Sequence, residues 1–203
     1  MGKIEAVIFD LGGVILDIDS KREADRFAEL GLEEYENIFT PTNMNDFFKR
    51  QEIGEVIEDN FYDGFRELTA TDLSDEDIHE AWNLILTDFM PERMAFLEEL
   101  AEKYPIYLFS NTNDIHTREF KKRCLDQTGR ELDSYFTQAF YSQELGLRKP
   151  EPAAFQKVLE LTDLAAETTV FIDDNADNIA GAASVGLQTI HLTDGKTILD
   201  LEF

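Results

Sequence analysis

The chain has 203 residues, enough for one sizeable core or for a core domain with a smaller insert. Hydrophobic residues make up 43% of it and include 16 Phe, which excludes a disordered polyelectrolyte although charged residues reach 30%. Asp and Glu number 43 against 18 Lys and Arg, and the resulting charge of -25 repels nucleic acid and anionic membranes. We therefore expect a globular protein that binds neither, and in which any bound phosphate meets a local cation.

Several features of the whole chain favour a cytoplasmic protein. The single cysteine, Cys124, cannot form an internal disulfide, and we expect it to be a small buried hydrophobic residue. The sequence has no apolar stretch near the ~20 residues of a membrane span, and a strand is expected so close to the N-terminus that we expect no signal peptide. Both a monomer and a homodimer are compatible with these features.

Short apolar segments predict strands, the first of which is Ala6 to Phe9. Four more follow at 106–109, 137–141, 169–172 and 188–191, and helical patterns at 114–125, 152–161 and 176–185 separate them. Pro152 is typical of a helix start, and Gly186 of a helix end. Strands that alternate with helices predict an α/β fold with a Rossmann-like, doubly wound parallel sheet.

The segment from about residue 20 to residue 103 interrupts this alternation, because its patterns are helical only. They cover 21–30, 56–68 and 74–89, and Ser74 with Asp77 is similar to a capping box at the start of the third. We expect a helical cap over the carboxyl edge of the sheet, with most of its Trp and Phe forming its own core. The predicted domains are an α/β core at 1–18 and 104–203 and a helical cap at 19–103.

Polar residues follow four of the predicted strands. Asp10 ends the first, Ser110 and Asn111 follow the second, Lys149 stands beside Pro150 after the third, and Asp173-Asp174 end the fourth. The carboxyl ends of parallel strands meet at one edge, where such sheets place ligands. A carboxylate there can attack a phosphate monoester if cations neutralise both anions, and paired carboxylates suit Mg²⁺.

In this order, the segments resemble the haloacid dehalogenase-like hydrolase superfamily over essentially the whole chain. The resemblance implies that Asp10 is the nucleophile, which forms an aspartyl-phosphate, and that Lys149 is both catalytic and substrate-binding. It implies that Ser110 and Asn111 bind the phosphoryl group. The cofactor it implies is Mg²⁺, held by the carboxylates of Asp10, Asp173 and Asp174 and by the backbone carbonyl of Gly12.

Gly12 departs from the family pattern. Two residues after the nucleophile, phosphatases of this superfamily usually have an Asp that serves as general acid and base. Gly12 stands at that position and offers the backbone carbonyl but no side-chain carboxyl. The segment Phe-Asp-Leu-Gly-Gly-Val resembles a capped bacterial branch that includes phosphatases similar to α-D-glucose-1-phosphate phosphatase. We therefore expect a phosphatase of a small phosphorylated metabolite, such as an anomeric hexose phosphate, whose comparatively acidic hydroxyl would ease the absence of a side-chain acid.

Two alternatives stay open at this point. The chain could be a non-catalytic or weakly active phosphate- or partner-binding protein, because Gly12 lacks the acid. It could also be a dehalogenase, which uses an Asp and a Lys but no metal, although adjacent carboxylates at Asp173 and Asp174 favour a bound cation.

Other residues near these motifs have simpler interpretations. We expect Arg148 to be a solvated neighbour of the lysine, and His79, His116 and His191 to be surface or structural residues. The segment 47–54, which mixes aromatic and cationic residues before a glycine, either contacts substrate or is an ordinary helix end.

Overall fold

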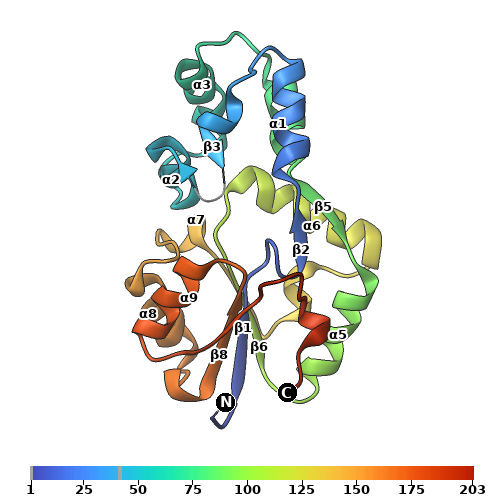
Figure 1. Cartoon of the computed structure of the whole chain (residues 1–203), viewed down its shortest axis with the longest axis vertical. Helices are drawn as coiled ribbons and strands as arrows, with labels where there is room; N and C mark the ends of the chain where they lie inside the picture. The colour runs from blue at the N-terminus through green and yellow to red at the C-terminus, as the bar shows by residue number, and fades with distance from the viewer. Residues whose placement is uncertain (1, 41–42) are drawn as a thin grey trace.

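The protein has two lobes, a sheet domain below and a group of helices above it (Figure 1). This computed structural model describes residues 2–40 and 43–203. The N-terminus leads directly into the central strand of the sheet, and both termini lie at the end of the molecule far from the helical lobe (Figure 1). The chain enters that lobe after its second strand and returns before its fifth.

The sheet is parallel and has the strand order β7-β6-β1-β8-β9. In that order the strands are Gln138–Tyr141, Ile106–Ser110, Ala6–Phe9, Thr169–Asp173 and Gln188–His191. In the register, Phe9 of β1 is paired with Leu108 of β6 and with Ile172 of β8. The residues that follow these three positions therefore emerge together at the carboxyl edge. The predicted α/β fold and its parallel sheet are confirmed.

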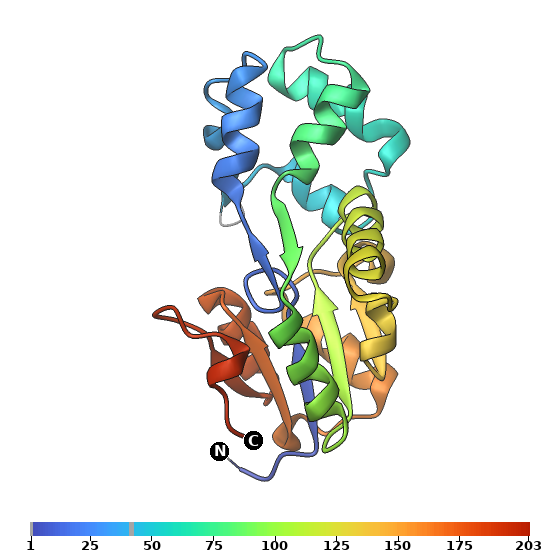
Figure 2. The same cartoon turned by 90° about the vertical axis from the view of Figure 1, so that its right-hand side faces the viewer.

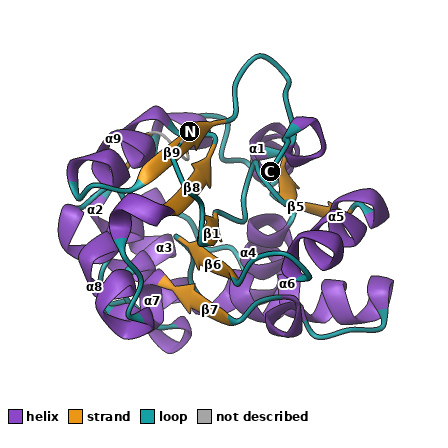
Figure 3. Ribbon diagram, turned by 90° about the horizontal axis from the view of Figure 1, so that it is seen from below, coloured by secondary structure: helices purple, strands orange, loops and turns teal. Residues whose placement is uncertain are grey.

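Helices cover both faces of the sheet (Figure 3). One face packs on α8 (Pro152–Thr162) and α9 (Ala176–Ser184), and the other on α5 (Pro91–Ala101) and α6 (Asp114–Thr128). Side chains alternate along β1, so Val7 and Phe9 join one hydrophobic core and Ala6 and Ile8 the other. Short elements complete this domain: α7 (Ser142–Leu145) and the 3₁₀ turns η2 (Leu132–Tyr135), η3 (Ala166–Thr168) and η4 (Ile198–Asp200).

The upper lobe contains helices around an aromatic core. Its elements are α1 (Ser20–Glu29), η1 (Tyr35–Asn37), β3 (Phe39–Thr40), β4 (Asn43–Met44), α2 (Asp46–Glu52), α3 (Glu58–Thr69) and α4 (Asp75–Asn83). Phe27 stacks on Tyr35 and on Phe65, which ties α1 to α3. The side chain of Asp19 caps α1, and that of Ser74 caps α4. Most aromatic residues of this lobe thus form its own core, as the sequence predicts.

The prediction of one helix over 74–89 is wrong. Helix α4 ends at Asn83, and β5 (Leu86–Phe89) pairs antiparallel with β2 (Leu16–Ile18). Leu86 and Phe89 are buried together with Leu16, and their spacing also fits a helical face, so the pattern alone was ambiguous. The insert is therefore not purely helical. Helix α5, which follows β5, lies beside the sheet (Figure 2), and the division into domains at residues 19 and 103 stays a prediction.

Two further expectations can be compared with the structure. Cys124 is completely buried in the core, as predicted. Within residues 2–40 and 43–203, the structure has no helix that is both long and apolar enough to span a membrane.

Candidate active site

Lys149 lies at the centre of the carboxyl edge and is completely buried. Its Nζ lies 2.8 Å from Oδ1 of Asp10 and donates to Oδ2 of Asp173 at 2.9 Å. Burial alone would lower the pKa of Lys149, but the two carboxylates raise it above its ordinary value, so the amine stays charged. Burial also raises the pKa of Asp10, the Asp173 carboxylate raises it further, and Lys149 opposes both.

Asn111 fixes the loop that carries Lys149. The backbone N–H of Lys149 donates to Oδ1 of Asn111 at 2.9 Å, and Nδ2 of Asn111 donates to the backbone carbonyl of Lys149 at 2.9 Å. This reciprocal pair joins the end of β6 to the lysine loop across 38 residues of sequence. Asn111 therefore determines where the lysine backbone lies, and its contact with a phosphoryl group stays a prediction.

Asp173 is held on several sides at the end of β8. Besides Lys149, its carboxylate accepts from the backbone N–H of Asn175 at 2.8 Å and from Nδ2 of Asn178 at 3.0 and 3.2 Å. Asn178 lies in the first turn of α9, in a segment that also resembles the capped branch, but its contact with Asp173 was not predicted. These contacts fix the orientation of the Asp173 carboxylate.

Three carboxylates converge at this edge and fit a hard divalent cation. Oxygen atoms of Asp10, Asp173 and Asp174 lie within 4.8 Å of one another. Burial and the nearby Asp173 raise the pKa of Asp174. The loop after β1 allows this approach because Gly13 has a φ of +73° and no side chain, and a Cβ there would lie 2.2 Å from Oδ2 of Asp174.

Ser110 and Gly12 lie in the same region. Ser110 is the buried last residue of β6, beside the end of β1. A Cβ added to Gly12 would lie 3.2 Å from Cγ1 of Ile18. The Ile18 side chain thus fills part of the space that a side chain at position 12 would enter.

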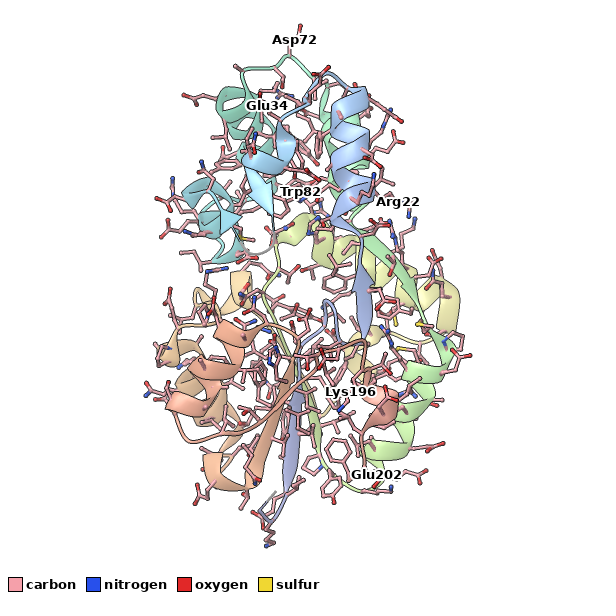
Figure 4. All side chains as sticks on the ribbon, in the orientation of Figure 1. Arg22, Glu34, Asp72, Trp82, Lys196 and Glu202 are labelled. Atoms are coloured by element: carbon pink, nitrogen blue, oxygen red, sulfur yellow. The ribbon has the colours of Figure 1, made fainter. Side chains whose placement is uncertain are left out.

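A cavity of about 960 Å³ lies between this edge and the upper lobe. Each predicted site residue except Asp173, which is buried beneath, lines it: Asp10, Gly12, Ser110, Asn111, Lys149 and Asp174. The opposite wall includes Phe39, Phe48, Gln51, Glu52 and Trp82, and Trp82 lies on the side of the upper lobe that faces the sheet domain (Figure 4). The segment 47–54 thus contributes to the cavity wall.

The expectation that Arg148 is solvated is wrong. Its Nε donates to Oε2 of Glu52 at 2.6 Å, and the two side chains are only 18% and 11% exposed. Burial raises the pKa of Glu52, and Arg148 opposes that shift. Arg148 is next to Lys149 in sequence, and it joins the lysine loop to the last residue of α2. Because 96 residues separate the partners, no local pattern indicates this ion pair.

His116 lines the cavity and is also held by protein partners, and its structural role stays a prediction. Its ring stacks on Trp82 with centroids 4.9 Å apart and planes 15° apart, and its Nε2 lies 3.0 Å from the Trp82 carbonyl oxygen. Burial lowers the pKa of His116 to about 4, so the ring is neutral near pH 7. The other two histidines also have protein partners: Nδ1 of His79 lies 2.9 Å from the Tyr62 hydroxyl, and Nε2 of His191 lies 2.9 Å from the Asp174 carbonyl oxygen.

Comparison with known proteins identifies the family. Residues 4–186 match the family model described as haloacid dehalogenase-like hydrolase. The chain belongs to this family. D-ribitol-5-phosphate phosphatase of Bacteroides thetaiotaomicron is 27% identical over 95% of this chain and 93% of its own length. Phosphorylated carbohydrates phosphatase of Thermotoga maritima is 23% identical over 97% of this chain and 91% of its own.

A solved structure of similar shape comes from Bacteroides thetaiotaomicron. It shows a variant of an enzyme of the haloacid dehalogenase (HAD) family in complex with magnesium and inorganic phosphate. Its TM-score is 0.90 at 33% identity, and the match covers 95% of this chain and 96% of that one. The predicted resemblance to a capped hydrolase of this superfamily, with phosphatases as its relatives, is confirmed.

Proposed function

We propose that this protein is a magnesium-dependent phosphatase of small phosphorylated sugars or polyols, with Asp10 as its nucleophile. The observation that carries the proposal is the position of Lys149, whose buried ammonium group lies between the carboxylates of Asp10 and Asp173. A buried cation in that place opposes protonation of the neighbouring carboxylates and offsets the charge of a second anion that approaches them. The named phosphatases among the relatives support the same reaction class.

The reaction would proceed in two displacements. An oxygen of Asp10 attacks phosphorus, the bond from phosphorus to the leaving oxygen breaks, and the alcohol departs with a proton from solvent because Gly12 offers none. Water then attacks the phosphorus of the aspartyl-phosphate, which releases inorganic phosphate and restores Asp10. Lys149 would neutralise phosphate charge in both steps, and Ser110, which lines the cavity, would donate its hydroxyl to a phosphate oxygen.

Magnesium fits the acidic cluster at the carboxyl edge. Asp10 and Asp174 would hold it with the Gly12 carbonyl, and the ion would supply positive charge against the phosphate oxygens. Asp173 would support this site, because its oxygens already accept hydrogen bonds from Lys149 and Asn178. The similar structure from Bacteroides thetaiotaomicron, solved with magnesium and phosphate, supports this assignment.

The substrate class follows from the cavity and the relatives. A volume of about 960 Å³ accommodates a small sugar phosphate. The relatives are named for ribitol 5-phosphate and for phosphorylated carbohydrates, so a primary phosphate is a candidate beside the anomeric hexose phosphate expected from the sequence. Comparing phosphate release from both substrates at equal concentration would decide between them.

The test of the reaction class is phosphate release by the parent chain and by Asp10→Asn, with Mg²⁺ or with EDTA. We expect release that needs Mg²⁺ and that Asp10→Asn abolishes, while Asp126→Asn, which changes an exposed Asp of α6, keeps parental activity. Undiminished release by Asp10→Asn would refute the nucleophile assignment. Halide release from a 2-haloacid without Mg²⁺ would instead support the dehalogenase alternative. Phosphate binding without any turnover would support the non-catalytic alternative.

A further inference from the structure

Ile18 presents an exposed apolar side chain to the active cavity. It is 37% exposed and lines the cavity, whereas the wall residues Phe48 and Trp82 are already buried by their own packing. The other exposed large hydrophobic residues in the described part of the chain, such as Ile57, lie outside the cavity lining. Single apolar residues on a surface are ordinary, but one inside a binding cavity offers a contact to the molecule that enters it.

The loop after β1 brings Ile18 close to Asp10. The backbone N–H of Leu16 donates to the carbonyl oxygen of Leu11 at 2.9 Å, so the chain turns back directly after Asp10. Gly12 forms a β-bridge with Leu16, the first residue of β2. A Cβ added to Gly12 would lie 3.2 Å from Cγ1 and 3.4 Å from Cδ1 of Ile18. The Ile18 side chain therefore lies beside the second residue after the proposed nucleophile.

The chain neighbours of Ile18 hold it between the two lobes. The carbonyl oxygen of Asp17 accepts from the Thr87 hydroxyl at 2.7 Å. The backbone N–H of Asp19 donates to the carbonyl oxygen of Ile85 at 2.9 Å. Both contacts join β2, which runs between the lobes (Figure 1), to the segment that contains β5. Ile18 is thus presented from a strand, which defines the position of a side chain better than a loop does.

The leaving group would pass along this side chain. It departs on the side of phosphorus that is opposite the attacking oxygen. With Asp10 as nucleophile at the end of β1, that side is the part of the cavity toward the upper lobe. Gly12 and Ile18 line this route, and neither has a polar side-chain atom. A charged group packed against them would lose hydration without gaining a partner, whereas C–H groups would bury apolar surface.

We propose that Ile18 is a specificity-determining residue that packs on the carbon atoms next to the phosphoester of the leaving group. This inference rests on the proposed phosphatase function and adds a limit on its substrate class. The cavity favours phosphates of polyols and sugars, in which the carbon atoms beside the phosphoester are uncharged. It discriminates against phosphates of hydroxy acids, which carry a carboxylate there.

The test compares phosphoglycolate with hydroxyethyl phosphate, in which a hydroxymethyl group replaces the carboxylate. The measured quantity is kcat/KM for phosphoglycolate divided by kcat/KM for hydroxyethyl phosphate, with Mg²⁺ present. Ile18→Lys places a cation beside the carboxylate, so it should raise this ratio about 3- to 10-fold over that of the parent. Ile18→Ala removes apolar surface and adds no charge, so it should raise the ratio about 2- to 4-fold by lowering kcat/KM for hydroxyethyl phosphate.

Ile57→Lys and Ile57→Ala are the matched controls. Ile57 is 45% exposed in the upper lobe and lies outside the cavity lining, so both variants should keep the ratio within about twofold of the parental value. An equal rise in Ile18→Lys and Ile57→Lys would show an effect of net charge alone and would overturn the proposal. An unchanged ratio in both Ile18 variants would overturn it as well. If Ile18→Lys fails to fold, Ile18→Ala decides.

A failure of the proposed function can be told apart from a failure of this contact. The phosphatase proposal fails if the parent releases phosphate from neither compound and from no polyol or sugar phosphate. Calorimetry with phosphoglycolate and hydroxyethyl phosphate then decides on the contact. Binding of phosphoglycolate that Ile18→Lys strengthens and Ile57→Lys does not would support the contact. Equal effects of the two variants would overturn it.

Discussion

Replacing Glu23 by Gln should stabilise the upper lobe progressively as the pH rises. Glu23 is completely buried in α1, where its Oε1 accepts from the Tyr35 hydroxyl at 2.7 Å and its Oε2 has no partner among the described residues. Burial raises the pKa of Glu23 to about 8, and the Tyr35 hydrogen bond opposes the shift only in part. In an unfolded chain this pKa lies near 4.5.

The sign and the size follow from these two values. The folded state binds the Glu23 proton more tightly than the unfolded state does. The protonated Glu23 therefore contributes fully to the free energy of unfolding below about pH 4.5, and this contribution is lost as the pH rises to about 8. At 1.36 kcal/mol per pH unit, the full loss is about 5 kcal/mol, of which about 3 kcal/mol falls between pH 5 and pH 7.5. Gln keeps an acceptor for Tyr35 and cannot ionise, so Glu23→Gln should avoid this loss.

The assay is urea unfolding followed by fluorescence of Trp82, the single tryptophan of the chain, which lies in this lobe. The free energy of unfolding of Glu23→Gln minus that of the parent should rise by about 3 kcal/mol from pH 5 to pH 7.5. Glu29→Gln changes an exposed Glu of the same helix, and its curve should run parallel to that of the parent. A pH-independent difference for Glu23→Gln would refute the argument, because it would mean that Glu23 titrates alike in both states.

Two further predictions concern the loop after β1. Gly13→Ala should cost about 1–2 kcal/mol of stability, because the position has a positive φ. It should also raise the Mg²⁺ concentration needed for half-maximal phosphate release, because the added Cβ would displace the Asp174 carboxylate. An unchanged Mg²⁺ requirement would contradict this. Gly12→Asp should fold if the side chain of Ile18, which is 37% exposed, moves aside. The variant should speed hydrolysis of alkyl phosphates more than that of p-nitrophenyl phosphate, because the p-nitrophenolate leaving group needs no proton. Equal effects in both assays would show that no general acid is missing.

The sheet could be predicted because its strands are short apolar runs with helical patterns between most of them. Strand β5 could not, because its buried Leu86 and Phe89 are three residues apart, which fits one face of a helix as well as a short strand with an irregular register. Its pairing with β2 depends on a contact between segments about 70 residues apart, such as the hydrogen bond from the Thr87 hydroxyl to the Asp17 carbonyl. A local pattern contains no information about such a partner.

The same limit applies to the site. Asp10, Ser110, Lys149 and Asp174 each follow a strand, so the topology brings them to one edge and the sequence indicates the cluster. The segment 47–54 stayed ambiguous between a substrate contact and a helix end, because its contacts are with distant residues. Glu52 meets Arg148 across 96 residues. The gathering of these residues at the strand ends was therefore predictable, whereas the contacts of the cavity wall on the upper lobe were not.

Two adjacent residues of the lysine loop contact different lobes: Arg148 contacts the upper lobe, and Lys149 contacts the sheet domain. Arg148 holds Glu52 of α2, while the adjacent Lys149 is fixed on both sides of its own backbone by Asn111 and through Nζ by Asp10 and Asp173. A movement of the upper lobe that broke the Arg148–Glu52 pair would leave the four contacts of Lys149 intact. It would also widen the cavity on the side that Gln51, one residue before Glu52, lines. We propose that the upper lobe moves in this way when substrate enters and product leaves, while Lys149 is held in place by its own contacts.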